Sequence, residues 1–312
     1  MSPAQRGEAD LEVLFEDNHL LALHKPAGLP VVPDESGDVS LFELAKGYLK
    51  RRYQKPGEVF LGVVHRLDRP VSGLVLFART SKAAARLSAQ WRAHAVSKRY
   101  LALGQPGPLP RAGEHSQWLQ KDEAARRVRV LPGPRAGALE ARTRLSARAL
   151  PSGTLAFELE PLTGRPHQLR VLCASLGAPL LGDLKYGAAK ALPDRSIALH
   201  AERLSFEHPT QRQALELSTP PPATPWWAEL LAGGVSSARR CVGGAAVRPR
   251  AACAAAGAGV RVGRQVRADA RAASARLRNR PPRGARSGAP PGRGYPPRSG
   301  GRDRSSAPPA RP

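Results

Sequence analysis

The sequence HRLDRPVSG, at residues 65–73, is a polar segment between two apolar runs. Val59–Val64 before it and Leu74–Ala78 after it have the length and composition of buried strands. The segment is therefore expected to form a turn between two strands, in which several ionisable side chains lie close together.

The turn contains one carboxylate, Asp68, which stands between Arg66 and Arg69. Two neighbouring guanidinium groups would lower the pKa of this carboxyl group and keep it ionised. An ionised carboxylate suits a nucleophilic or electrostatic role better than that of a general acid. Composition alone also allows a charged surface loop with no catalytic role.

The patterns on either side of the turn predict an α+β domain. The expected helices begin at a capping box formed by Ser40 and Glu43, after Ser81 as an N-cap, at Pro166 and at Pro225. Apolar and polar residues alternate over 139–149 and again over 155–159, which predicts an antiparallel hairpin. Further strands are expected over 11–15, 20–24, 100–103 and 197–206. Because helices interrupt the strands irregularly, the expected sheet is mixed and mainly antiparallel, flanked by helices.

Two further clusters carry polar groups. In TGRPHQLR, at residues 163–170, Arg165 precedes a predicted helix start, where it could bind phosphate or pair with a carboxylate. Solvated basic residues at a helix start are the alternative. In SKRY, at residues 97–100, Tyr100 is either a core aromatic or a platform for a stacked base. The other histidines show no metal-ligand spacing and are interpreted as structural: His19, His24, His94, His115, His200 and His208.

The charge of the chain is unevenly distributed. Its 312 residues include 49 Lys+Arg and 25 Asp+Glu, which gives a net charge of +24. Residues 236–312 contain 18 Arg, no Lys and two acids, so that +16 lies there and +8 lies in residues 1–235. Ala, Arg, Gly and Pro fill 57 of these 77 positions, and Phe, Trp and Ile are absent, which predicts a disordered tail. Residues 1–10 are expected to be a flexible N-terminus and 11–235 a single domain.

The tail has two interpretations. Its Arg/Gly segments at 292–295 and 298–302 are similar to segments that bind RNA without sequence preference. Arg-, Ala-, Gly- and Pro-rich sequence without Lys, Glu or His is also what out-of-frame translation of GC-rich sequence would produce. Both interpretations stay open.

Several classes of protein are excluded or disfavoured. No apolar run approaches the length of a membrane span, and the first residues lack a secretory signal. Three widely spaced cysteines support neither a disulfide framework nor a structural zinc site. We therefore expect a cytoplasmic protein without a metal site, and the positive charge favours nucleic acid as its partner.

Five segments together resemble the RluA-type RNA pseudouridine synthases. They occur in that family's order: EDNHLLALHKPAGLPVVP at 16–33, HRLDRPVSG at 65–73, KRYLAL at 98–103, TGRPHQLRVLCASLGAPLLGDLKYG at 163–187 and ALHAERLSFEHP at 198–209. The resemblance covers roughly Leu11 to Leu231 and implies that family's catalytic fold with a central active-site cleft. Many members carry an accessory N-terminal RNA-binding domain, which is not expected here because the catalytic pattern begins by Leu11.

The resemblance also implies an activity and a substrate. A uridine of rRNA or tRNA would be isomerised to pseudouridine without a cofactor, after the nucleotide has flipped out of its stack. Asp68 aligns with the family's essential aspartate, which acts at the glycosidic carbon by attacking the sugar or by accepting a ribose proton. The sequence does not distinguish these two mechanisms.

Other residues take implied roles at the same site. Tyr100 aligns with the tyrosine that packs on the target uracil, and Arg165 with the arginine that pairs with the aspartate. Arg66 aligns with a residue that fills the space left by the flipped nucleotide. His65 is grouped with these substrate-binding residues. The expected supporting residues are His167, Gln168 and Arg170.

The chain departs from the family at three positions, where Val71, Pro166 and Leu172 replace Thr, Thr and His. All three replacements are compatible with the fold, and an active monomeric enzyme is expected. The alternative is a catalytically silent RNA-binding protein with the same fold. A glycosidase with paired carboxylates lacks support, because no second acid accompanies Asp68 in its motif.

Overall fold

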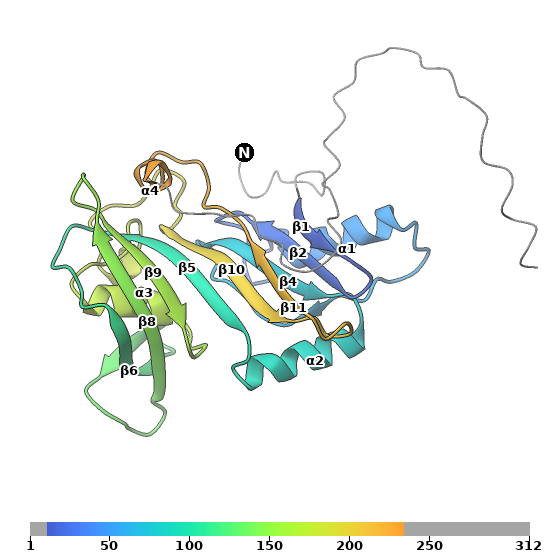
Figure 1. Ribbon diagram of the computed structural model, residues 1–312, viewed down its shortest axis with the longest axis horizontal. Coiled ribbons are helices and arrows are strands. Elements are labelled where there is room, and N and C mark those ends of the chain that lie inside the picture. Colours follow the sequence, from blue (N-terminus) through green and yellow to red (C-terminus); the bar gives the residue numbers. More distant parts are fainter. Residues whose placement is uncertain (1–10, 234–312) are drawn as a thin grey trace, which may run out of the picture. The chain divides into compact units, whose positions relative to one another are not determined.

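A computed structural model describes residues 11–233 of the chain (Figure 1). The predictions of a flexible segment over 1–10 and of a disordered tail over 236–312 concern residues outside this range. Within it, no helix is both long enough and apolar enough to cross a membrane.

The described residues form one sheet of eleven strands. Along its main path the strands are β1 (Glu12–Glu16), β2 (Leu20–Lys25), β4 (Ser72–Ala78), β10 (Leu199–Glu207), β5 (Ser97–Gly104), β9 (Leu155–Pro161), β8 (Leu139–Ala149), β6 (Gly113–Asp122) and β7 (Arg127–Leu131). Two short strands pair from the side, β3 (Gly62–Val63) with β4 and β11 (Ala214–Ser218) with β10. Among these pairings only that of β4 with β10 is parallel, which confirms the predicted mixed, mainly antiparallel sheet.

The parallel pairing of β4 with β10 joins the two halves of the sheet, β1, β2 and β4 on one side and β10, β5, β9, β8, β6 and β7 on the other, through only two pairs of residues. It consists of Ser72 opposite His200 and Gly73 opposite Ala201. Gly73 has φ +129°, and a Cβ atom there would lie 2.4 Å from the Ala201 carbonyl oxygen, so this close approach requires glycine. The buried His200 ring bridges the junction, since its Nδ1 accepts from the Ser72 hydroxyl at 2.9 Å and its Nε2 donates to the Thr219 carbonyl at 3.0 Å.

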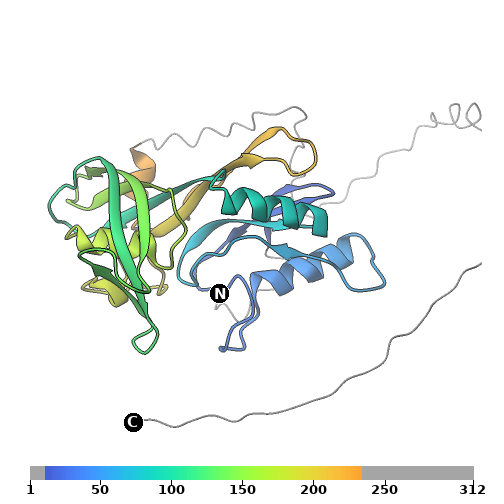
Figure 2. The same cartoon turned by 90° about the horizontal axis from the view of Figure 1, so that it is seen from below.

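Helices α1 (Leu41–Arg52) and α2 (Ser81–Arg92) cover opposite faces of β2 and β4 (Figure 2). Side chains along the two strands point alternately to the two faces of the sheet. Those on the α1 side are Leu21, Leu23, Val75 and Phe77, and those on the α2 side are Leu20, Ala22, Leu74, Leu76 and Ala78. All of these side chains are buried. Continuous apolar runs such as Leu74–Ala78 therefore mark strands covered on both faces.

The local signals located the helix starts to within three residues, the largest difference being at α4 (Ala228–Ala232), which begins at Ala228 rather than at Pro225. The predicted capping box is present, since the Glu43 amide donates to the Ser40 hydroxyl and the Glu43 carboxylate accepts from the Ser40 backbone. The second helix begins at Ser81, but its N-cap is Thr80, whose hydroxyl accepts from the Ala83 amide at 3.2 Å. The prediction of Ser81 as the N-cap was therefore wrong by one residue.

The third and fourth helices lie on opposite faces of the sheet's other half. Helix α3 (Gln168–Ser175) shares the apolar core of α1, and Tyr100 on β5 packs against that core. Helix α4 (Ala228–Ala232) packs on the opposite face, against Leu101 and Leu103. The predicted start of α3 at Pro166 was two residues early, because His167 has a left-handed φ of 52°.

Three strand predictions were wrong or missing. The run Val59–Val64 forms only the two-residue strand β3. The hairpin of β6 and β7 was not predicted, because most of its side chains are polar and Leu119 is the only fully buried residue of β6. Strand β11 was also missed. Strand β6 lacks an alternating pattern, whereas β7 (RVRVL) and β11 (ALELS) alternate over only five residues each, a short signal that was overlooked.

Candidate active site

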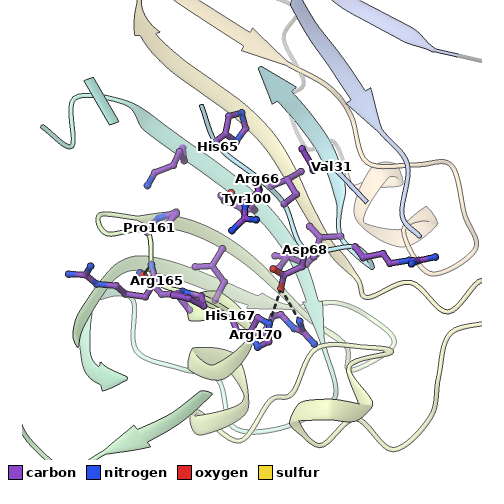
Figure 3. A pocket seen from close by; sticks show the side chains of 18 of the residues that line it. Val31, His65, Arg66, Asp68, Tyr100, Pro161, Arg165, His167 and Arg170 are labelled. Atoms are coloured by element: carbon purple, nitrogen blue, oxygen red, sulfur yellow. Dashed lines mark hydrogen bonds and ion pairs between the residues drawn. The ribbon is translucent and has the colours of Figure 1, made fainter. Parts of the chain in front are cut away.

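A cleft of about 560 Å³ opens on the face of the sheet that carries α1 and α3. Its walls come from segments far apart in the sequence: 30–34 before α1, 64–71 before β4, Trp91 of α2, Lys98 and Tyr100 of β5, 161–170 at the end of β9 and start of α3, and Leu199 of β10. All eight residues predicted for the site line this one cleft: His65, Arg66, Asp68, Tyr100, Arg165, His167, Gln168 and Arg170. All of them except Gln168 are labelled in Figure 3.

Backbone hydrogen bonds fix the turn that carries Asp68. The Arg69 carbonyl accepts from the Gly28 amide at 2.8 Å and from the Lys25 ammonium at 3.1 Å. The Lys25 side chain is fully buried and also donates to the Leu29 carbonyl at 2.8 Å. The guanidinium of Arg69 returns a bond to the Gly28 carbonyl at 3.0 Å. These bonds join the turn that carries Asp68 to the segment 25–29, and they fix the backbone from which the Asp68 side chain extends.

The carboxylate of Asp68 is held by Arg170. Nη1 of Arg170 donates to Oδ2 of Asp68 at 2.8 Å, a contact that one of the dashed lines in Figure 3 marks, and the Asp68 side chain remains 35% exposed. The predicted flanking pair does not form this contact, because Arg69 turns away to the carboxylate of Asp38 and Arg66 is exposed.

The prediction that Arg165 pairs with Asp68 was also wrong. Nε of Arg165 donates instead to the Glu140 carbonyl at 2.9 Å. Arg165 lies in the loop before α3, whereas Arg170 lies inside the helix, where its side chain is directed into the protein. The two arginines of the motif therefore have different positions, at the rim and at the base of the cleft.

Arg170 is itself anchored in the interior. Its Nε and Nη2 donate to the two carboxylate oxygens of Asp183 at 2.7 and 2.8 Å, and its guanidinium lies 5.1 Å from the ring centre of Tyr186. Burial alone would lower the pKa of Arg170, but the hydrogen bonds and charge of Asp183, together with Asp68, raise it. From sequence alone neither Asp183 nor Tyr186 has a predicted role, although both belong to the motif GDLKYG at residues 182–187.

His167 approaches the same carboxylate from the side. Its Nε2 lies 3.8 Å from Oδ2 of Asp68, and its Nδ1 lies 2.6 Å from the Tyr186 hydroxyl. Burial lowers the pKa of His167, an effect that the charge of Asp68 partly offsets, so the ring is neutral near pH 7.

Gln168 lines the edge of the cleft and braces the loop. Its Oε1 accepts from the Thr163 hydroxyl at 2.8 Å and from the Arg165 amide at 3.0 Å. Its Nε2 donates at 2.9 Å to the Arg142 carbonyl and at 2.9 Å to the Thr143 hydroxyl on β8. The amide group is thus fully used, and it ties the rim loop to the sheet.

Tyr100 and Lys98 stand on the same side of β5, two residues apart. Burial, followed by the charge of Asp68, raises the pKa of Tyr100, so its hydroxyl stays protonated. Lys98 donates to the Thr163 carbonyl at 3.3 Å, and burial lowers its pKa. Within residues 11–233 no carboxylate lies within ion-pair distance of Lys98, Arg66 or Arg165. These three cations line the cleft without a counter-charge, as an anionic ligand requires.

His65 forms part of the wall. Its ring stacks on Trp91 at 5.0 Å between ring centres, and its Nε2 accepts from the Leu76 amide at 2.9 Å. Burial, with a smaller effect of the charge on Lys98, lowers its pKa to about 4. The acceptor nitrogen of His65 is therefore occupied by the protein, and only its ring edge can face a ligand.

The arrangement of these side chains is typical of an enzyme that acts on a single nucleotide. A partly exposed carboxylate is held through one oxygen by a buried arginine, an aromatic ring lies next to it, and unpaired cations surround both. Such a site can act on one nucleotide of an RNA chain, with the carboxylate as the reacting group and the cations near the phosphates.

Comparison with known proteins identifies the family. Residues 19–175 match the profile of the RNA pseudouridylate synthases. The dual-specificity RNA pseudouridine synthase RluA of Pasteurella multocida is 35% identical over 213 residues, which are 68% of this chain and 93% of that protein. The ribosomal large subunit pseudouridine synthase D of Xanthomonas campestris is 34% identical over 225 residues, 68% of this chain and 66% of that one.

Solved structures agree with this result. The human RNA pseudouridylate synthase domain containing 4 superimposes with a TM-score of 0.56 and 25% identity, covering 70% of this chain and 90% of that one. The chain belongs to the RNA pseudouridine synthase family, whose members isomerise uridine in RNA to pseudouridine. The family resemblance inferred from the five motifs is confirmed.

Proposed function

We propose that this enzyme isomerises specific uridines of ribosomal or transfer RNA, with Asp68 as its catalytic residue. The observation that supports the role of Asp68 is the asymmetry of its carboxylate. Oδ2 accepts from Arg170 at 2.8 Å, whereas Oδ1 has no hydrogen bond from any described residue. One oxygen is thus fixed by the protein and the other is available to the ribose.

The reaction exchanges one bond of the base for another. The N1–C1′ bond of uridine breaks, the uracil turns, and a C5–C1′ bond forms; C5 then loses a proton and N1 gains one, so that the product is an isomer of the substrate. Asp68 either attacks C1′ or accepts a ribose proton while the N1–C1′ bond breaks. Its ionised state serves both routes.

The surrounding residues would hold the flipped nucleotide. The ring of Tyr100 offers a face on which uracil can pack, next to Asp68 on the floor of the cleft. Lys98 and Arg165 would bind phosphates on either side of the target, and the exposed Arg66 would fill the place of the flipped nucleotide in the RNA stack. No cofactor takes part in this scheme.

The test measures pseudouridine at nucleotide resolution in rRNA and tRNA that lack the modification. Wild-type protein should form it at defined positions, and Asp68→Asn should form none while still binding the RNA. The variant should fold, because Arg170 keeps both bonds to Asp183. Pseudouridine formation by Asp68→Asn, or none by wild type on any of these RNAs, would overturn the proposal; the second result would favour a silent RNA-binding protein.

We also propose a monomer that acts in the cytoplasm, with residues 11–235 as the catalytic domain. Ribosomal RNA as substrate is supported by the name of the Xanthomonas relative. Light scattering after size-exclusion chromatography should give the mass of one chain, and a dimer mass would refute the monomer.

A further inference from the structure

A chain of hydrogen-bonding groups leads from strand β7 to the catalytic carboxylate. The Val128 amide donates to the Tyr186 hydroxyl at 3.0 Å, and this hydroxyl lies 2.6 Å from Nδ1 of His167. The other ring nitrogen, Nε2, lies 3.8 Å from Oδ2 of Asp68. Tyr186, His167 and Asp68 come from three separate segments of the chain, and each hydrogen bond in the series sets the orientation of the next group.

The hydrogen bonds determine which nitrogen of His167 carries the proton. The Tyr186 oxygen already accepts from Val128, and its own proton needs an acceptor. Among the described residues, Nδ1 of His167 is the only acceptor within hydrogen-bond distance of this hydroxyl. Nδ1 must therefore accept, and the neutral ring carries its proton on Nε2, the nitrogen nearest to Asp68.

The backbone supports this orientation. His167 is the N-cap residue of α3 but makes no side-chain cap, and its φ of 52° is in the left-handed region. Side chains other than glycine adopt this region at a cost in energy, although Asn, Asp and His do so more readily than others. The ring lies edge-to-face against Tyr186, with 5.6 Å between ring centres. The site thus accepts backbone strain that places an imidazole, rather than a capping group, beside the carboxylate.

We propose that Tyr186 fixes the Nε2–H tautomer of His167, and that His167 is a positioning residue that donates this hydrogen to Oδ2 of Asp68 in the substrate complex. The distance of 3.8 Å must shorten by less than 1 Å to form the bond. Catalytic hydrogen bonds are commonly long in free enzymes and shorten with substrate bound.

This arrangement makes Oδ1 the reacting oxygen in either mechanism. If Oδ1 attacks C1′, it forms an ester oxygen; if it accepts a ribose proton, it becomes a hydroxyl. In both cases Oδ2 becomes a carbonyl oxygen, which still accepts from Arg170 and His167. The two donors therefore hold the carboxylate in one orientation before, during and after the step.

Variants at residue 167 separate this role from a purely structural one. The amide nitrogen of Gln can replace Nε2, whereas that of Asn replaces Nδ1 and cannot reach Asp68. His167→Met and His167→Asn should lower kcat about tenfold or more with KM for RNA unchanged, and His167→Gln should restore most of it. Because Asn tolerates φ 52° better than Gln or Met, the Asn variant should be the most stable of the three. A structural role would instead make the Asn variant the most active.

Two further measurements complete the test. Tyr186→Phe should lower kcat severalfold, whereas Tyr48→Phe, which removes a hydroxyl bonded to Glu16 at 2.8 Å outside the cleft, should not. In the wild-type enzyme, ¹⁵N NMR of the His167 ring should show the proton on Nε2. A proton on Nδ1, equal activity of the Gln and Met variants, or a change confined to KM would each overturn the proposal. Loss of all activity in Asp68→Asn is a separate result and concerns the proposed function.

Discussion

Replacing Asp183 by Asn is a direct test of how the catalytic carboxylate is held. The Asp183 side chain is 1% exposed and accepts two bonds from Arg170, at 2.7 and 2.8 Å. Asn has one acceptor oxygen, so one of these bonds is lost and an amide N–H group is placed against a guanidinium. Arg170 would remain attached to Asp68 but would be held by one bond instead of two at its other end.

The expected cost follows from these contacts. Breaking a buried ion pair by removing one partner costs about 3–5 kcal/mol. Because Asn keeps one acceptor and Asp68 still neutralises Arg170, we expect a loss of about 2–3 kcal/mol in the free energy of unfolding. For a domain of this size that corresponds to a fall in Tm of roughly 5–10 °C. Loss of the fixed guanidinium position should lower kcat by about tenfold to a hundredfold.

The assay combines thermal unfolding with single-turnover pseudouridine formation, and includes Glu58→Gln as a matched control. Glu58 accepts from Lys46 at 2.6 Å, a contact as short as those of Asp183, but its side chain is 85% exposed, so its removal should leave Tm unchanged. If Asp183→Asn unfolds at the wild-type temperature, or retains wild-type kcat, the clamp does not position Asp68 and the reasoning fails.

Three other predictions concern the junction, the wall and the rim of the site. Gly73→Ala should destabilise the fold by about 2 kcal/mol or more, because its Cβ would lie 2.4 Å from the Ala201 carbonyl oxygen; an unchanged urea midpoint would contradict this. Burial lowers the pKa of His65 from 6.5 to about 4, so between these values the unfolded chain binds a proton that the folded chain excludes, and the free energy of unfolding decreases by up to about 3 kcal/mol as the pH is lowered from 6.5 to 4. In His65→Gln the Gln side chain can accept from the Leu76 amide without titrating. The free energy of unfolding, measured with urea, should therefore decrease less between pH 7 and pH 4.5 in this variant than in the wild type. Lys98→Met should weaken RNA binding and lower the slope of log K against log salt by about one, whereas an unchanged slope would show that Lys98 contacts no phosphate.

Local features of the fold could be predicted from the sequence because their causes are local. The capping box at Ser40 and the alternation over 139–149 depend on neighbouring residues, and both are present in the structure. Strand β6 was missed because its few apolar residues do not alternate. Strands β7 and β11 do alternate, as RVRVL and ALELS, but each is only five residues long, and the sequence pattern does not show which strand it pairs with.

The composition of the site was predictable, but its internal contacts were not. The motifs placed eight residues in one cleft, yet they gave Asp68 the wrong partner. Asp68 and Arg170 are 102 residues apart, and the direction of each arginine depends on where α3 begins. His167 shifts that start through its left-handed backbone, an effect that no sequence pattern predicts. The same limit explains why Asp183 and Tyr186 had no assigned role.

The position of β10 has a consequence for the synthesis of the enzyme. This strand is among the last to be made, yet it lies between β4 and β5, which are made much earlier. A growing chain that ends before Leu199 would contain two half-sheets with unpaired inner edges and nothing to align Asp68 with the segment that holds it. Such edges invite pairing with other chains, and their closure depends on contacts between distant residues, which form slowly. The catalytic site should therefore be assembled only after β10 has been made, about two thirds of the way along the 312-residue chain, and nascent fragments that end before it should be inactive and prone to aggregate.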